Sequence, residues 1–234
     1  MRIYLIRHAD PDYENDTITE AGHREARALA ERMAALSLTD IRVSPMGRAR
    51  ATARYTAEAL GLEPVVEAWT AELSDLRTED PRWKGRMAWD IPGEAIRSHY
   101  DGGDQEAWFE DGPFRFPAVN AAARAIAAAS DLFLKTYGYE RDGGRYRILA
   151  PSRAQVAVFC HGGFGLTWLA HLLGLPLPLV WSSFWLAPSS VTTLVMDERS
   201  ETWAAPRCLG LGDASHLYAA GLPVRPRGII ANFD

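Results

Sequence analysis

The stretch YLIRHADPDYE, residues 4–14, carries an apolar run into a polar loop. Residues 2–7 (RIYLIR) are apolar on both alternating faces, which is typical of a central strand covered by helices on both sides. This strand ends at Arg7 and His8, two side chains that can carry positive charge at the entrance to a loop. An isolated Arg–His pair indicates no more than a solvated strand end, so its meaning depends on where the other strands end.

A second strand ends in the same way, because residues 155–161 (QVAVFCH) form an apolar run that stops at Cys160 and His161. Alternating strand and helix patterns along the chain predict an α/β fold, a three-layer α/β/α sandwich with a mostly parallel central sheet. Ligands bind outside the carboxyl ends of the strands in such sheets, so both histidines are expected to meet at one edge. The other strands are predicted over residues 40–45, 64–69 and a hairpin around 198–201, and the helices over 19–36, 46–61, around 119–133 and 163–174.

Residues 1–234 are expected to form one domain with an insertion. From about residue 78 to residue 116, proline, glycine, charged and aromatic residues mix without a sustained period, which predicts a lid-like insertion. Within it, DGGDQE at 101–106 lacks the ligand spacing of a calcium loop and is expected to be a turn. The aromatic residues of the insertion either line a substrate entrance or anchor it: they are Trp83, Trp89, Trp108, Phe109, Phe114 and Phe116.

The composition limits the partners. A net charge of -5 gives no electrostatic reason to expect nucleic acid or an anionic membrane. Two cysteines are too few for a disulfide framework and suit a reducing compartment, so a cytoplasmic location is expected. Residues 154–196 contain no Asp, Glu, Lys or Arg, but Pro176 and Pro178 break any helix long enough to cross a bilayer. This stretch is expected to be buried core or an apolar interface, with residues 181–186 as the candidate face of a homodimer.

Cationic groups gather at the predicted edge of the sheet. The second strand ends at Ser44, and the helix that follows places Arg48 in its first turn. Behind His161, Gly162 and Gly163 lead into another helix, whose free N–H groups and dipole favour an anion. Together with Arg7 these groups predict a phosphate-sized pocket, because the planar fork of an arginine gives bidentate contacts to phosphoryl oxygens.

Four motifs in this order resemble the histidine phosphatase superfamily, the fold shared with phosphoglycerate mutases. They are RHA at 7–9, ITEAGHREA at 18–26, SPMGRARATA at 44–53 and FCHGG at 159–163. Each lies at a strand end or a helix start, and the resemblance covers roughly residues 1–76 and 155–175. GDASHL at 212–217 is similar to a C-terminal motif of some members, which leaves the role of His216 open.

The resemblance implies a role for five residues. His8 matches the nucleophile that becomes phosphohistidine, and Arg7 matches its phosphate-binding neighbour. Arg48 and His161 match the arginine and the second histidine that hold the phosphoryl group. Glu72 stands where the family places its proton donor, although Asp75, Glu79 and Asp80 compete for this role. No metal site and no cofactor is implied.

Some positions depart from the family pattern. Ala9 replaces the usual glycine, and Glu25 stands where glutamine is usual, a change expected to affect only the helix surface. Asn15 lies near, but not on, the spacing of a phosphate-contacting asparagine, so its role stays open. Cys160 is expected to be buried core, because successive strand residues point to opposite faces and cannot form a Cys–His dyad.

The sequence therefore predicts a metal-independent phosphomonoesterase that acts through phosphohistidine on a small phosphorylated metabolite. A cofactor-dependent phosphoglycerate mutase would use the same pocket and is the alternative enzyme. RHA in place of RHG, and the absence of the acidic, glycine-containing stretch that follows the proton donor in mutases, favour the phosphatase. The remaining hypothesis is a non-catalytic module that binds phosphorylated ligands. Loss of a pocket residue would favour this hypothesis, and none of the pocket residues is missing.

Overall fold

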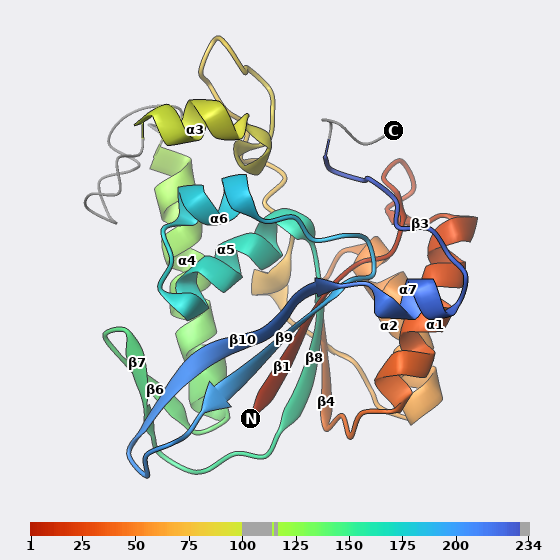
Figure 1. The fold of residues 1–234 in the computed structure, drawn as a ribbon, viewed down its shortest axis with the longest axis vertical. Coiled ribbons are helices and arrows are strands. Elements are labelled where there is room, and N and C mark those ends of the chain that lie inside the picture. The colour runs from red at the N-terminus through yellow and green to blue at the C-terminus, as the bar shows by residue number, and fades with distance from the viewer. Residues whose placement is uncertain (100–113, 115–116, 230–234) are drawn as a thin grey trace.

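The computed structural model describes residues 1–99, 114 and 117–229, which build a central sheet with helices on both faces (Figure 1). The sheet has eight strands in the order β5-β4-β8-β1-β9-β10-β7-β6 within this described part. These strands are β1 Arg2–Arg7, β4 Asp40–Val43, β5 Val65–Val66, β6 Tyr139–Asp142, β7 Arg145–Ile148, β8 Gln155–Cys160, β9 Val191–Asp197 and β10 Trp203–Asp213. A small ladder pairs β2 Pro11–Asp12 with β3 Thr17–Ile18.

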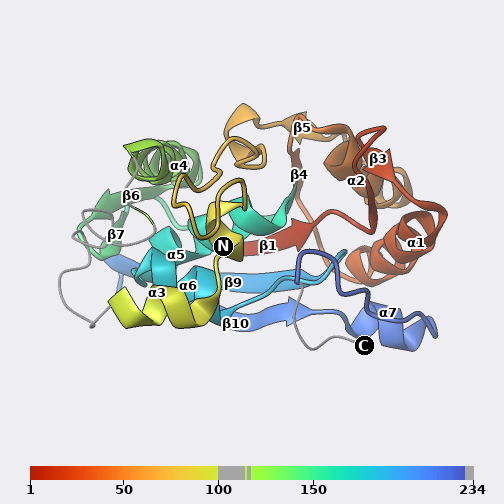
Figure 2. The same cartoon turned by 90° about the horizontal axis from the view of Figure 1, so that it is seen from above.

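Helices and sheet form the three predicted layers, and the α/β class is confirmed. The helices are α1 Glu20–Ala34, α2 Gly47–Leu60, α3 Gly93–His99, α4 Pro117–Thr136, α5 Gly162–Leu173, α6 Leu177–Ser183 and α7 Ser215–Ala219, with short 3₁₀ turns η1 Ala68–Thr70 and η2 Ala88–Asp90. Figures 1 and 2 show α4, α5 and α6 on one side of the strands and α1, α2 and α7 on the other. The two larger clusters of the hydrophobic core are divided in the same way, one under each layer of helices, and a small third cluster contains Ala9, Ile18 and Ala26.

The parallel part of the sheet positions the two histidines. Strands β5, β4, β8 and β1 run parallel, and β9 joins β1 in the opposite direction and begins the antiparallel half. In the pairing of β1 with β8, Arg7 lies opposite Cys160. The residues that follow, His8 and His161, therefore leave the sheet side by side at its carboxyl edge, as the sequence predicts.

The insertion packs on the α5–α6 side of the molecule. The indole of Trp89 lies 6.4 Å from the ring of Trp181, and Phe114 lies 5.5 Å from the same ring. A Cβ on Gly163 would come within 2.6 Å of Trp89, so this glycine allows the indole to lie against the start of α5. The described aromatic residues thus anchor the insertion, whereas Trp108, Phe109, Phe116 and the DGGDQE segment lie outside the described residues.

Several details differ from the sequence predictions. Glu25 does not lie on the surface of α1: its side chain is buried and accepts a hydrogen bond from the Asp10 backbone N–H. Trp181 and Leu186 are buried in the core, whereas Phe184 between them is exposed, and the homodimer face over residues 181–186 stays a prediction. The hairpin β6–β7 and helix α6 were not predicted, because neither has a long periodic pattern. Among the described residues, no helix combines the length and apolar character of a membrane span.

Candidate active site

His8 follows β1 and is buried at the carboxyl edge of the sheet. Its Nδ1 lies 2.8 Å from the carbonyl oxygen of Ala9, which can only accept, so Nδ1 carries the proton and Nε2 carries the free lone pair. Burial, helped by the positive charge of Arg7, holds the pKa of His8 well below its usual range. The imidazole is therefore neutral near pH 7 and has a nucleophilic nitrogen available.

His161 leaves β8 beside His8, and the two ring centroids are 5.2 Å apart. Its Nε2 lies 2.7 Å from the Ser44 hydroxyl, which itself accepts a hydrogen bond from the Met46 N–H. The Ser44 hydroxyl proton can then be donated to Nε2, which leaves Nδ1 of His161 protonated. Burial lowers the pKa of His161 to about 2, with Arg48 as the next cause, so this ring is also a neutral hydrogen-bond donor.

The two arginines are held in place by different parts of the chain. Arg7 donates through Nη1 to the carbonyl oxygens of Leu186 and Arg227, and burial lowers its pKa. Arg48, in the first turn of α2, donates to Asp16 at 2.7 Å. A Cβ on Gly47 would lie 2.1 Å from the Asp16 carbonyl oxygen, so glycine at this position lets the loop between β2 and β3 approach the start of α2.

Three buried N–H groups of these side chains are ready for an anion. Nε of Arg7, Nε of Arg48 and Nδ1 of His161 have no hydrogen-bond partner among the described residues. A buried donor without a partner carries a desolvation cost that a bound anion would remove. Gly162 lies beside them, since a Cβ there would be 3.5 Å from Nε of Arg7.

Glu72 lies at the start of α5, after η1. Its carboxylate accepts hydrogen bonds from the backbone N–H groups of Gly163 at 3.1 Å and Phe164 at 2.8 Å. These are two of the helix N–H groups that the sequence assigned to an anion, and here a carboxylate of the chain itself occupies them. Of the residues at the α5 N-terminus, Gly162 remains as the candidate for a contact with phosphate.

The C-terminal segment contributes residues that the sequence gave no signal for. The backbone carbonyl of Arg227 accepts a hydrogen bond from Arg7. Nε of the Arg227 side chain donates a second hydrogen bond, to the buried Asp10 at 2.7 Å. Tyr13 lies with its ring 5.5 Å from the Arg48 guanidinium carbon and edge-on to His8. These contacts place residues from both ends of the chain around the two arginines.

Other candidate residues lie outside the pocket. Asn15 is exposed and bonds Asp12 through its side-chain amide, so it does not take part in the cluster. His23 lies in α1 and forms a hydrogen bond with Tyr55, and His171 lies in α5 and forms one with Asp131. Cys160 is buried core, where burial raises the pKa of its thiol, and this confirms its assignment. The described residues contain no group of three or more His, Cys, Asp or Glu arranged to hold a metal ion.

Solved structures with the same architecture include two phosphatases. A phosphoserine phosphatase mutant from Entamoeba histolytica, in complex with phosphoserine, is 18% identical with a TM-score of 0.62, over 92% of this chain and 98% of that one. A mycobacterial glucosyl-3-phosphoglycerate phosphatase complexed with VO3 is 22% identical with a TM-score of 0.58, over 90% of this chain and 98% of that one. At these identities the likeness shows the fold alone.

The sequence comparisons give the family. The model of the histidine phosphatase superfamily (branch 1) matches residues 3–207, so this chain belongs to that superfamily. A probable phosphoglycerate mutase of Photorhabdus laumondii is 28% identical over 115 residues, which are 41% of this chain and 54% of the relative. One from Klebsiella pneumoniae is 32% identical over 115 residues, again 41% and 54%. The chain thus spans about half the length of these curated relatives.

Proposed function

We propose that this protein hydrolyses phosphomonoesters of small metabolites through a phosphohistidine on His8, without a metal ion. The observation that carries the proposal is the convergence of a neutral imidazole that presents Nε2 with three unpartnered N–H groups on Arg7, Arg48 and His161. This arrangement supplies a nucleophile and the donors for the phosphoryl oxygens in one buried cluster of side chains. Both cysteines are free, which supports a reducing, cytoplasmic setting.

In the first step, Nε2 of His8 attacks phosphorus in line as the bond from phosphorus to the leaving oxygen breaks. Arg7, Arg48 and His161 hold the equatorial oxygens and stabilise the charge that spreads over them. The Ala9 carbonyl keeps its hydrogen bond to Nδ1 and stabilises the positive charge that develops on the ring. The transfer is thus split into two displacements at phosphorus, with Nε2 as the attacking group in the first and the leaving group when water attacks in the second, which replaces a single difficult attack by water.

Glu72 is the proposed proton donor and acceptor. It must deliver a proton to the leaving oxygen in the first step and remove one from water in the second. Its place at the start of α5, bonded to Gly163 and in electrostatic contact with Arg7, supports this role. The two backbone N–H groups fix the carboxyl group, so that its orientation does not depend on the substrate.

The proposal is tested by trapping the intermediate. A ³²P-labelled monoester is turned over and quenched, and the label is expected on His8 as an acid-labile, base-stable phosphoryl group. His8→Ala should abolish turnover and labelling, whereas His23→Ala, a histidine of α1 bonded to Tyr55 outside the pocket, should keep both. Label on Ser44 or Cys160 would refute the assignment. A substrate panel should include phosphoserine, 3-phosphoglycerate and glucosyl-3-phosphoglycerate, the compounds in the names of the solved structures.

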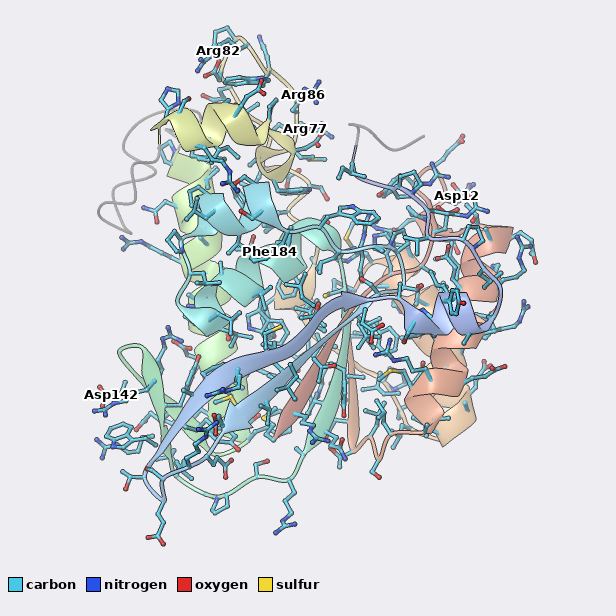
Figure 3. All side chains as sticks on the ribbon, in the orientation of Figure 1. Asp12, Arg77, Arg82, Arg86, Asp142 and Phe184 are labelled. Carbon is cyan, nitrogen blue, oxygen red and sulfur yellow. The ribbon has the colours of Figure 1, made fainter. Side chains whose placement is uncertain are left out.

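A phosphoglycerate mutase is the second candidate, because the curated relatives carry that name. A mutase must grip the carboxylate of its substrate while it reorients, yet two basic residues of the insertion are paired within it. Arg82 bonds Asp80 at 2.7 Å, and Arg86 lies 3.7 Å from Asp90. Figure 3 shows Arg82 at the tip of this loop, above α3, and Arg86 lower on the same loop. With 3-phosphoglycerate and a trace of 2,3-bisphosphoglycerate, rapid formation of 2-phosphoglycerate with little free phosphate would establish the mutase instead.

A further inference from the structure

The turn before β9, residues 186–190 (LAPSS), forms hydrogen bonds with the backbone of Arg7 and His8. The Arg7 N–H donates to the Ser190 carbonyl at 3.2 Å, and the Ser189 N–H donates to the His8 carbonyl at 3.1 Å. The Leu186 carbonyl accepts from the Arg7 guanidinium. The position of the nucleophile therefore depends on the conformation of this turn.

Ser189 holds an unusual conformation in this turn. Its φ is 58°, in the left-handed region that side chains other than glycine rarely adopt. The residue is 0% exposed, and its hydroxyl lies 3.0 Å from Nε2 of His216, which is also buried. A left-handed serine persists only where its surroundings hold it, and the bond to His216 is the side-chain contact that holds this one.

His216 belongs to the GDASHL motif, which no step of the proposed reaction uses. Helix α7 presents it to the turn from the α1 side of the sheet, and the neighbouring Asp213 is paired with Arg32 at 2.7 Å. Burial lowers the pKa of His216 to about 4, so the ring is neutral near pH 7 and its bond to Ser189 does not depend on charge.

We propose that His216 is a positioning residue, which fixes the turn through Ser189 and so holds His8 in the geometry for attack on phosphorus. The chain of contacts runs from Nε2 of His216 to the Ser189 hydroxyl, and from the Ser189 N–H to the His8 carbonyl. This role rests on the proposed function, since it concerns the same nucleophile. His216 does not touch the phosphoryl group.

The test is a double-mutant cycle on p-nitrophenyl phosphate. His216→Ala should lower kcat about tenfold or more, because small displacements of a nucleophile are costly, and KM should change by less than about threefold. His216→Gln keeps a side-chain amide that can bond the hydroxyl and should recover most of the loss. Ser189→Gly takes the left-handed conformation without the hydroxyl, so His216→Ala added to it should have little further effect. Ser189→Ala removes the hydrogen bond between Ser189 and His216 by deleting the hydroxyl. This variant is used in the cycle instead of His216→Ala if His216→Ala does not fold.

His23→Ala is the matched control, because it removes another histidine–hydroxyl hydrogen bond that does not reach the site. An equal loss of kcat from His216→Ala in the wild-type and Ser189→Gly backgrounds would refute the chain of contacts. A lower melting temperature with unchanged kcat would reduce His216 to a structural role and overturn the proposal. Ring ¹⁵N and ¹H NMR signals of His8 give a readout that needs no turnover. If no monoester is hydrolysed, the proposed function fails, and His216→Ala must still shift the His8 signals for the positioning role to stand.

Discussion

Glu25 is a buried carboxyl group beside the loop that carries the nucleophile, and replacing it with glutamine should change how stability depends on pH. The side chain is 2% exposed and accepts the Asp10 N–H at 2.8 Å through Oε2. Its other oxygen makes no hydrogen bond within the described structure, and the nearest cation, Nε of Arg225, is 3.9 Å away. The buried carboxylate of Asp10 faces it as well.

Burial raises the pKa of Glu25 from 4.5 to about 7. Between these two values the folded chain keeps a proton that the unfolded chain releases, so the free energy of unfolding falls as pH rises through this window. A shift of this size corresponds to about 3 kcal/mol, fully lost above pH ~7.5. Glu25→Gln keeps the shape and an acceptor for the Asp10 N–H but cannot ionise, so it should match the wild type near pH 4.5 and be about 3 kcal/mol more stable at pH 8.

Urea unfolding followed by circular dichroism from pH 4.5 to pH 8.5 measures this difference. Glu31→Gln is the matched control, because Glu31 lies on the same helix with an exposed side chain. The difference between Glu25→Gln and the wild type should grow with pH, whereas Glu31→Gln should run parallel to the wild type. If Glu25→Gln is less stable than the wild type at pH 8, the interaction with Arg225 outweighs the burial cost and the reasoning is refuted.

Three further results are expected. Glu72→Gln should slow hydrolysis of alkyl phosphates by about 100-fold and that of p-nitrophenyl phosphate by less than about tenfold, because nitrophenolate leaves without a proton. Equal losses for the two substrates in stopped-flow assays would place the proton donor elsewhere. Asp75→Asn is the control. Hydrolysis should persist in EDTA and be inhibited by vanadate, because Arg7, Arg48 and His161 take the place of a metal; activity lost to EDTA and restored by Mg²⁺ would contradict this. Gly163→Ala would bring a Cβ within 2.6 Å of Trp89 and should cost about 1–3 kcal/mol of stability in urea unfolding, whereas Gly144→Ala, with nothing within 4 Å, should be close to neutral.

The sequence was sufficient for the parts of the site that lie on regular elements. His8 and His161 follow adjacent parallel strands, and Arg48 begins a helix, so periodicity and topology place them together without any coordinates. The family motifs add their roles. Position on a strand end is a local property, and for this reason it can be read from the chain.

Contacts that depend on loop conformation could not be predicted. The hydrogen bonds of Arg48 to Asp16 and of Arg227 to Asp10 depend on segments with no periodic pattern. Arg227 and Asp10 are also separated by more than 200 residues of sequence. Glu25 was placed on the surface of its helix because a charge usually lies there, but the loop after β1 covers it. Tertiary packing, which has no local signature, decided each of these cases.

In the proposed reaction, the charges around His8 would let one site serve both binding and attack. Burial and the positive charge of Arg7 depress the pKa of His8, so the ring is neutral before any substrate arrives. An incoming phosphate dianion offsets the arginine charges and supplies acceptors for the unpartnered N–H groups, so binding relieves costs that the empty pocket bears. The same anion would favour a protonated ring, which would be useless as a nucleophile. The hydrogen bond from Nδ1 to the Ala9 carbonyl fixes the tautomer and keeps the free Nε2 available, while burial opposes protonation. The anchoring of the His8 backbone by Ser189 belongs to the same requirement, because a neutral ring reacts only if Nε2 is already directed at phosphorus.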